Sequence, residues 1–98
     1  MPSNKTSQVF FTYVLRSLKD DYAYVGYTDN LKKRLEEHQK GKSFATRLRR
    51  PFKLIYFEAC LNEQDAKQRE KYLKTTNGRR FLIKRLKHYR AKTVWHLW

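Results

Sequence analysis

The sequence has little of several features that mark common classes of protein. Its 98 residues include one cysteine, Cys60, which excludes an internal disulfide framework and a cysteine-based zinc site. The apolar stretches fall far short of the roughly 20 residues that span a bilayer. Residues 1–8 lack the apolar run of a signal peptide. We therefore expect a soluble cytoplasmic protein without membrane segments.

Acidic residues are also scarce. The chain carries 23 Lys and Arg against 9 Asp and Glu, a formal net charge of +14. A charge of about 2–8 suffices to keep a small domain soluble, and a larger surplus opposes compaction through self-repulsion. The surplus therefore predicts a polyanionic partner. Nucleic acid is the first candidate, and an anionic membrane and an acidic protein are the alternatives.

Three segments have the β-branched and aromatic composition of strands: residues 9–17, 22–28 and 52–60. A short polar turn joins the first two, which predicts an antiparallel hairpin. In the second strand, alternation places Tyr24 and Gly26 on one face and Val25 and Tyr27 on the other. Gly26 inside a strand is typical of a close backbone approach.

Three helices are predicted around these strands. The first follows the capping residues Asp29 and Asn30 and stops at Gly41. Asn62 caps the second helix. A break at residues 75–78 precedes the third, which covers residues 79–89.

The resulting order is strand, strand, helix, strand, helix, helix (ββαβαα), an α+β domain. The length of the chain is that of a single domain, and the 15% aromatic content argues against intrinsic disorder. We expect a flexible N-terminus at residues 1–8, the domain at residues 9–89, and a C-terminal tail at residues 90–98.

A few polar residues stand on predicted core-facing stripes. Arg34 and His38 share one face of the first helix beside its apolar stripe, where they could also form an ordinary surface pair. Glu70 lies on the same stripe of the second helix as Ala66 and Leu73. A buried carboxylate needs a partner or a metal, and an ion pair with Lys67, Arg69 or Lys74 is the simpler explanation.

Tyrosines are dense in the hairpin, at positions Tyr13, Tyr22, Tyr24 and Tyr27. Each alone is typical of half-buried packing with the hydroxyl in water. Their order along the chain, followed by Arg34, His38 and Glu70, resembles the GIY-YIG nucleases. Phe11-Thr12-Tyr13 stands at the first signature and Tyr24-Val25-Gly26 at the second. Phe11 and Thr12 depart from the family by replacing the glycine and isoleucine of the first signature.

The resemblance implies a three-stranded antiparallel sheet flanked by three helices, and hydrolysis of DNA phosphodiester bonds with one divalent metal, Mg²⁺ or Mn²⁺. It implies that Glu70 holds the metal and that Arg34 binds the scissile phosphate. Tyr13 or Tyr24 would activate the attacking water, which requires positive charge nearby to lower a pKa near 10. His38 would receive the proton itself or hold a tyrosine hydroxyl in place, and the sequence leaves the general base open.

The remaining basic residues predict a phosphate-binding surface around the first helix, its following loop and the third helix. Phosphate contacts carry no sequence information, so weak sequence specificity is expected. We expect DNA as the partner, branched or damaged DNA included, with a protein partner for targeting and no small-molecule cofactor. The predicted nucleic-acid-binding residues are Gly26, Tyr27, Lys32, Lys33, Lys42, Arg47, Arg49, Arg50, Arg79 and Arg80.

Three hypotheses follow. The first is a metal-dependent endonuclease. The second is a non-catalytic nucleic-acid-binding protein on the same fold, and the third is a small basic domain that binds acidic protein or lipid. Glu70 favours the first, because a carboxylate in a phosphate-binding groove repels DNA.

Overall fold

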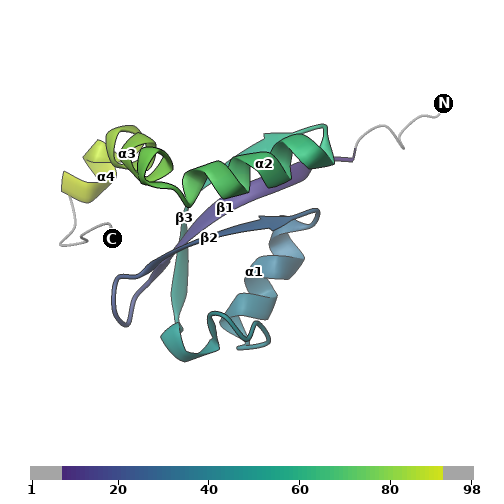
Figure 1. Ribbon diagram of the computed structural model, residues 1–98. Helices are drawn as coiled ribbons and strands as arrows, with labels where there is room; N and C mark the ends of the chain where they lie inside the picture. Colours follow the sequence, from purple (N-terminus) through teal and green to yellow (C-terminus); the bar gives the residue numbers. More distant parts are fainter. Residues whose placement is uncertain (1–7, 92–98) are drawn as a thin grey trace.

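A three-stranded antiparallel sheet forms the centre of the computed structural model, which describes residues 8–91 (Figure 1). The strand order is β2-β1-β3. The sequence predicted all three strands to within one residue at each end, and the expected α+β fold is confirmed. The strands are β1 (Phe10–Ser17), β2 (Ala23–Thr28) and β3 (Phe52–Cys60).

Asparagine caps start the first two helices, as predicted. The side chain of Asn30 accepts a hydrogen bond from the backbone N–H of Lys33, and Asn62 does the same for Asp65. Each satisfies one of the N–H groups that a helix leaves unpaired at its start. The helices are α1 (Leu31–Gln39), the short 3₁₀ helix η2 (Arg47–Arg49), α2 (Glu63–Leu73), α3 (Thr76–Arg85) and α4 (Lys87–Ala91).

The third helix differs from the prediction at both ends. Thr75 caps it by accepting from the N–H of Gly78, so α3 begins at Thr76 and includes most of the predicted break. A side chain at position 78 would overlap the carbonyl oxygen of Tyr72 at the end of α2. Glycine here therefore permits close contact between two helices, and it does not end one. Leu86 separates α3 from α4.

The ends of the chain lie largely outside the described residues. Of the predicted N-terminus at residues 1–8, only the last residue is described. Helix α4 continues to Ala91, past residue 90, the predicted start of the tail. Within residues 8–91, none of the helices has the length and apolar character needed to cross a membrane.

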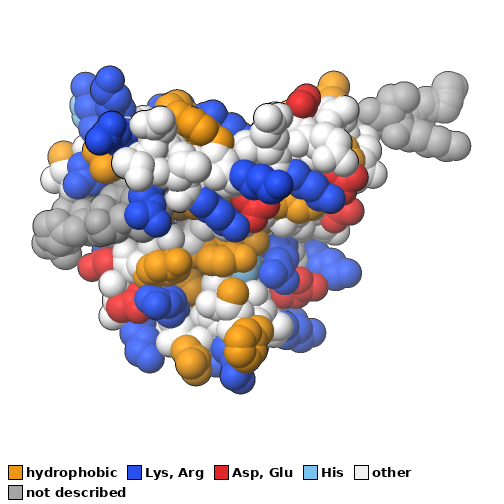
Figure 2. Space-filling view, viewed as in Figure 1, with side chains coloured by type: hydrophobic (Ala, Val, Ile, Leu, Met, Phe, Trp, Pro, Cys, Tyr) orange, Lys and Arg blue, Asp and Glu red, His pale blue; other side chains and the backbone are white. Residues whose placement is uncertain are grey.

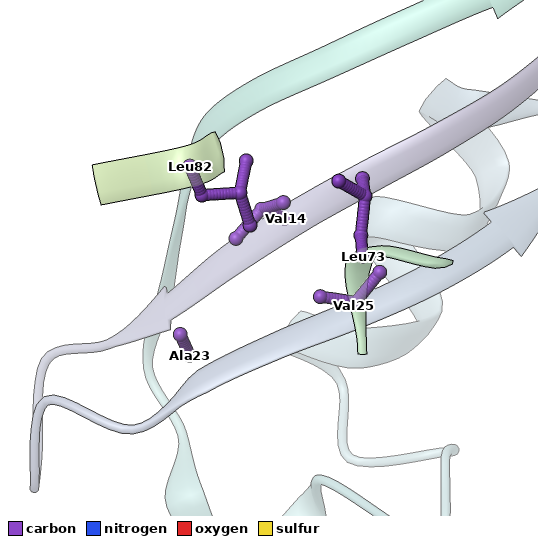
Figure 3. Close-up of a cluster of buried hydrophobic side chains, with 5 residues drawn as sticks. All are labelled: Val14, Ala23, Val25, Leu73 and Leu82. Carbon is purple, nitrogen blue, oxygen red and sulfur yellow. The ribbon is translucent and has the colours of Figure 1, made fainter. Parts of the chain in front are cut away.

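Two separate cores cover the two faces of the sheet. On one face, α2 and α3 pack on a cluster of buried side chains that Figure 3 shows: Val14, Ala23, Val25, Leu73 and Leu82. On the other face, α1 packs on Tyr13, Leu15 and Phe52 through its half-buried leucines. The alternation along β1 sends Val14 into one core and Tyr13 into the other. Tyr13 therefore faces α1, and this places it beside His38.

Candidate active site

Tyr13 is the centre of a hydrogen-bonded cluster on the α1 face of the sheet. Its hydroxyl lies 2.8 Å from Nε2 of His38, and both side chains are fully buried. Gly26 on β2 lies opposite Tyr13 in the strand register, and a Cβ there would overlap the Tyr13 hydroxyl. The sequence predicted a close backbone approach at Gly26 and placed it among the nucleic-acid-binding residues. In the structure, the space it leaves accommodates the tyrosine.

His38 is held on both sides. Its Nδ1 atom lies 2.7 Å from Oγ1 of Thr46, which is also fully buried. Burial, with a smaller contribution from the charge of Arg34, lowers the pKa of His38 to about 4. The ring is therefore neutral at neutral pH, with one donor and one acceptor nitrogen. The ordinary surface-pair explanation does not apply to His38, because its ring is inside the cluster.

The pKa of Tyr13 moves in the opposite direction from what its proposed role as a base requires. Burial raises it to about 12, and Tyr24 and Glu70 add to the increase. Arg34 acts against this as a hydrogen-bond partner and a positive charge, but burial dominates. The hydroxyl is therefore protonated at neutral pH and is able to donate to Nε2 of neutral His38.

Arg34 is both held in place and accessible. Its guanidinium lies 2.9 Å from Oε1 of Glu37 and donates to Oγ of Ser43 at 3.3 Å. Its side chain is 31% exposed. These contacts fix a planar donor group beside the Tyr13 hydroxyl, and its exposure leaves donors within reach of an oxyanion.

Tyr24 joins the cluster through its ring. The ring centroid of Tyr24 lies 5.3 Å from that of His38 and 6.4 Å from that of Tyr13. Tyr27 does not join it. As alternation predicts, Tyr27 faces α2, where its hydroxyl donates to Glu63 at 2.7 Å and its ring stacks on Phe10.

Glu70 approaches from the other side of the sheet, on α2. Its carboxylate pairs with Lys74 at 2.9 Å, one of the simple ion pairs that the sequence allows. The side chain is 23% exposed, and its charge contributes to the raised pKa of Tyr13. A hollow of about 270 Å³ is lined in part by Tyr24, Lys74 and Arg79. Tyr24 of the cluster and Lys74, the ion-pair partner of Glu70, thus line the same hollow.

The described residues gather few protein ligands for a metal ion. Across the described part of the chain, no group of three or more His, Cys, Asp or Glu side chains lies together. Mg²⁺ is commonly bound by one or two carboxylates, with water and substrate phosphate as the other ligands. Glu70, partly exposed and paired with a displaceable surface lysine, fits that pattern.

Most of the predicted phosphate-binding side chains are exposed, and Figure 2 shows Lys and Arg outnumbering acidic groups on the face in view. Arg49 differs, because it pairs with Asp20 at 2.5 Å and stacks over the ring of Tyr22. The exposed ones are Lys32 and Lys33 on α1, Lys42, Arg47 and Arg50 in the next loop, and Arg79 and Arg80 on α3.

Sequence reasoning missed three residues that support the cluster. Ser43 and Thr46 are buried in the loop after α1 and bond to Arg34 and His38, and Glu37 pairs with Arg34. An acid at i+3 from an arginine was a visible signal for Glu37. The loop has no periodicity, so the sequence offered no signal for the two hydroxyl residues.

The burial of His38 predicts a pH effect on stability. The unfolded chain protonates this histidine near its ordinary pKa of 6.5, whereas the folded protein does so only near 4. The contribution of neutral His38 to stability is therefore fully present above the pKa of the unfolded chain. It is lost as the pH falls towards the pKa of the folded protein. We expect the free energy of unfolding to drop by about 2 kcal/mol between pH 7 and pH 5.

Urea unfolding of His38→Gln measures this contribution by difference, because carboxylates titrating in the same range affect both proteins. The variant should lose about 2 kcal/mol less than the wild type over that interval. His88→Gln is the matched control, since His88 is exposed on α4. Equal pH dependence in His38→Gln and the wild type would contradict a neutral buried histidine.

Comparison with known proteins decides the family. The family model described as the GIY-YIG catalytic domain matches residues 9–89. The chain belongs to the GIY-YIG family. The resemblance to the family signatures at Tyr13, Tyr24 and Gly26 therefore reflects membership of this family. Membership places it in a family of nucleases, whose substrates are nucleic acids.

Several curated proteins that are similar to this chain are small bacterial proteins named UPF0213. That of Clostridium perfringens is 43% identical over 65 residues, covering 65% of this chain and 69% of the relative. That of Pediococcus pentosaceus is 48% identical over 62 residues, or 62% and 64% of the two chains. The UPF0213 protein YazA of Bacillus subtilis is 41% identical over 71% of this chain and 70% of its own. The chain thus spans just under two thirds of the Pediococcus relative. No solved structure matches.

Proposed function

We propose that this protein is a Mg²⁺-dependent endonuclease that hydrolyses DNA phosphodiester bonds with weak sequence specificity. The observation that carries the proposal is the linked series of Arg34, Tyr13, His38 and Thr46, in which a partly exposed guanidinium adjoins a buried tyrosine–histidine pair. A protein that only binds phosphate backbones has no need to bury such a pair beside an arginine.

Arg34 is the proposed ligand of the scissile phosphate. Its guanidinium is oriented by Glu37 and Ser43 before any substrate arrives. Donors fixed in advance stabilise the charge that develops on the phosphate oxygens in the transition state, because they need not reorganise during the reaction. Removing one such donor typically costs about 10²–10³ in rate.

Tyr13 and His38 are buried in the free protein, and we propose them as the path for the proton of the attacking water once bound substrate brings that water to the Tyr13 hydroxyl. Tyr13 is protonated, so it accepts a proton at its oxygen only while passing its own proton to Nε2 of His38. Burial is the main cause of the low pKa of His38, and an anionic phosphate beside Arg34 would offset the smaller contribution of the Arg34 charge and so favour this transfer. Tyr24, with its ring against both, would help to position the water.

Glu70 is the proposed metal ligand. Mg²⁺ bound there would supply a Lewis acid for the phosphate and the leaving oxygen. The carboxylate would exchange its contact with Lys74 for the cation, at little cost because exposed ion pairs of this kind are weak. The surrounding exposed lysines and arginines would hold the strand through its phosphates, which accounts for weak sequence specificity.

The deciding experiment is a nuclease assay on plasmid, single-stranded and branched DNA, with Mg²⁺ or Mn²⁺ and with EDTA. The wild type should cut in the presence of either metal and not in EDTA. Arg34→Ala should lower the rate about a hundredfold, and Arg34→Lys should recover only part of it, because an ammonium lacks the planar fork. Lys53→Ala, which removes one exposed positive charge from β3, is the control.

The outcomes separate the hypotheses. Tight DNA binding by the wild type without cleavage of any substrate would favour the non-catalytic binding protein. Cleavage by Arg34→Ala at the wild-type rate would place the active site elsewhere or indicate a contaminant. Absence of DNA binding would leave an acidic protein or a lipid as the polyanion.

A further inference from the structure

The loop between α1 and β3 presents apolar side chains to solvent while it buries polar ones. Phe44 is 84% exposed and Leu48 is 74% exposed, whereas Ser43 and Thr46 are buried. In most surface loops the polar side chains are exposed and the apolar ones are buried, so this loop is reversed. Figure 2 shows hydrophobic side chains beside Lys and Arg at the end of the molecule where this loop lies in Figure 1.

The buried polar side chains tie the loop to the proposed active site. Thr46 bonds to His38, and Ser43 accepts from Arg34. Leu48 is anchored as well, because Lys19 of the hairpin donates to its carbonyl oxygen at 3.1 Å. Phe44 therefore lies along the chain between Ser43 and Thr46, which bond to residues of the proposed site. These contacts hold its segment in place.

The charge of the loop identifies the chemistry of its partner. Residues 42–50 contain Lys42, Arg47, Arg49 and Arg50 and no acidic residue. The guanidinium of Arg47 lies 5.0 Å from the centroid of the Phe44 ring. An accessible aromatic ring among cations is the arrangement that binds single-stranded nucleic acid, with the cations on the phosphates and the ring on a base.

We propose that Phe44 stacks on an unpaired base of the DNA strand that enters the site, with Leu48 against the same nucleotide or its neighbour. This rests on the proposed function and specifies its substrate as DNA with unpaired bases near the cleaved bond. A base inside a perfect duplex is stacked on both faces and offers no surface to the ring. The loop would thus distinguish strands by pairing and not by sequence, since every base has a face on which to stack.

Binding measured by fluorescence anisotropy in EDTA tests the proposal separately from catalysis. The probe is a fluorescein-labelled oligonucleotide, used single-stranded and as a perfect duplex. Phe44→Ala should weaken binding of the single strand about tenfold and binding of the duplex by less than about twofold. Phe44→Trp should retain the wild-type preference. Leu61→Ala is the control, because Leu61 is as exposed as Leu48 (74%) but lies away from this loop. It should change binding of neither the single strand nor the duplex.

A second readout detects the stacked base. A single strand containing 2-aminopurine should lose fluorescence on binding to the wild type and to Phe44→Trp, and keep it with Phe44→Ala. Equal weakening of both DNA forms, or none, would overturn the proposal. So would capture by phosphatidylglycerol vesicles that depends on Phe44 while DNA binding does not, because the loop would then be a membrane contact.

The two proposals fail in different ways. A wild-type protein that shows the Phe44-dependent preference but cuts no DNA contradicts the nuclease function alone. A protein that cuts DNA with equal efficiency in the wild type and Phe44→Ala, and shows no preference in EDTA, contradicts the stacking contact alone.

Discussion

Glu70→Gln should reduce DNA cleavage at least about a thousandfold, because loss of a bound metal removes several kcal/mol of charge stabilisation from the transition state. The substitution keeps the size of the side chain and removes its charge. Binding of DNA in EDTA should stay the same or become slightly tighter, since a negative charge facing phosphate is lost. Single-turnover cleavage with saturating enzyme measures the chemical step without the binding step.

Stability distinguishes a functional effect from a structural one. The pair between Glu70 and Lys74 is an exposed i,i+4 contact, worth about 0.3–0.5 kcal/mol. Glu70→Gln should therefore unfold at nearly the wild-type urea concentration. Glu36→Gln on α1 is the matched control, with the same change in charge at an exposed position. Glu70→Gln that cuts at the wild-type rate at every metal concentration would exclude Glu70 as the metal ligand.

Tyr13→Phe should lower cleavage at least about a hundredfold, since relay of a proton by a positioned side chain typically contributes 10²–10⁴. It should also lower the free energy of unfolding by about 1–3 kcal/mol, because Nε2 of His38 loses its buried hydrogen-bond partner. The phenyl ring still fills the core, so the variant should fold.

The pH profile of the variant separates these two effects. If Tyr13 passes the proton to His38, the wild-type cleavage rate falls at acid pH as His38 becomes protonated, and the residual rate of Tyr13→Phe lacks that dependence. Tyr72→Phe removes a hydroxyl from a half-exposed ring on α2 and should leave both rate and stability unchanged. A Tyr13→Phe rate within twofold of the wild type would rule out the relay.

The strands and the first two helices were predictable because their signals are local. Alternation placed Tyr24 and Val25 on opposite faces of β2, and the caps at Asn30 and Asn62 indicated where the first two helices begin. A capping side chain and the N–H it satisfies are three residues apart, so the sequence holds both partners of the contact.

The start of α3 was not predictable in this way. Gly78 looks like a helix breaker when only its neighbours in sequence are considered. Its role depends on the backbone of Tyr72 in the preceding helix, which lies close only after the two helices pack. Tertiary contact there overrides the low helix propensity of glycine.

The family was predictable from the sequence, whereas the chemical state of the proposed site residues was not. The order of Tyr13, Tyr24, Arg34, His38 and Glu70 along the chain pointed to a family that the comparison confirms. The state of Tyr13 was not foreseen, because its raised pKa comes from burial between elements that are distant in sequence. Ser43 and Thr46 escaped notice for the same reason, since their partners lie on α1.

The residues of the proposed site come from two separately packed cores. Arg34 and His38 belong to the layer formed by α1, whereas Glu70 belongs to the layer formed by α2 and α3 on the opposite face. Tyr13 is sensitive to both, since the charges of Arg34 and Glu70 shift its pKa in opposite directions. The proposed site therefore draws its residues from both layers, and any change in how either layer packs on the sheet would alter it.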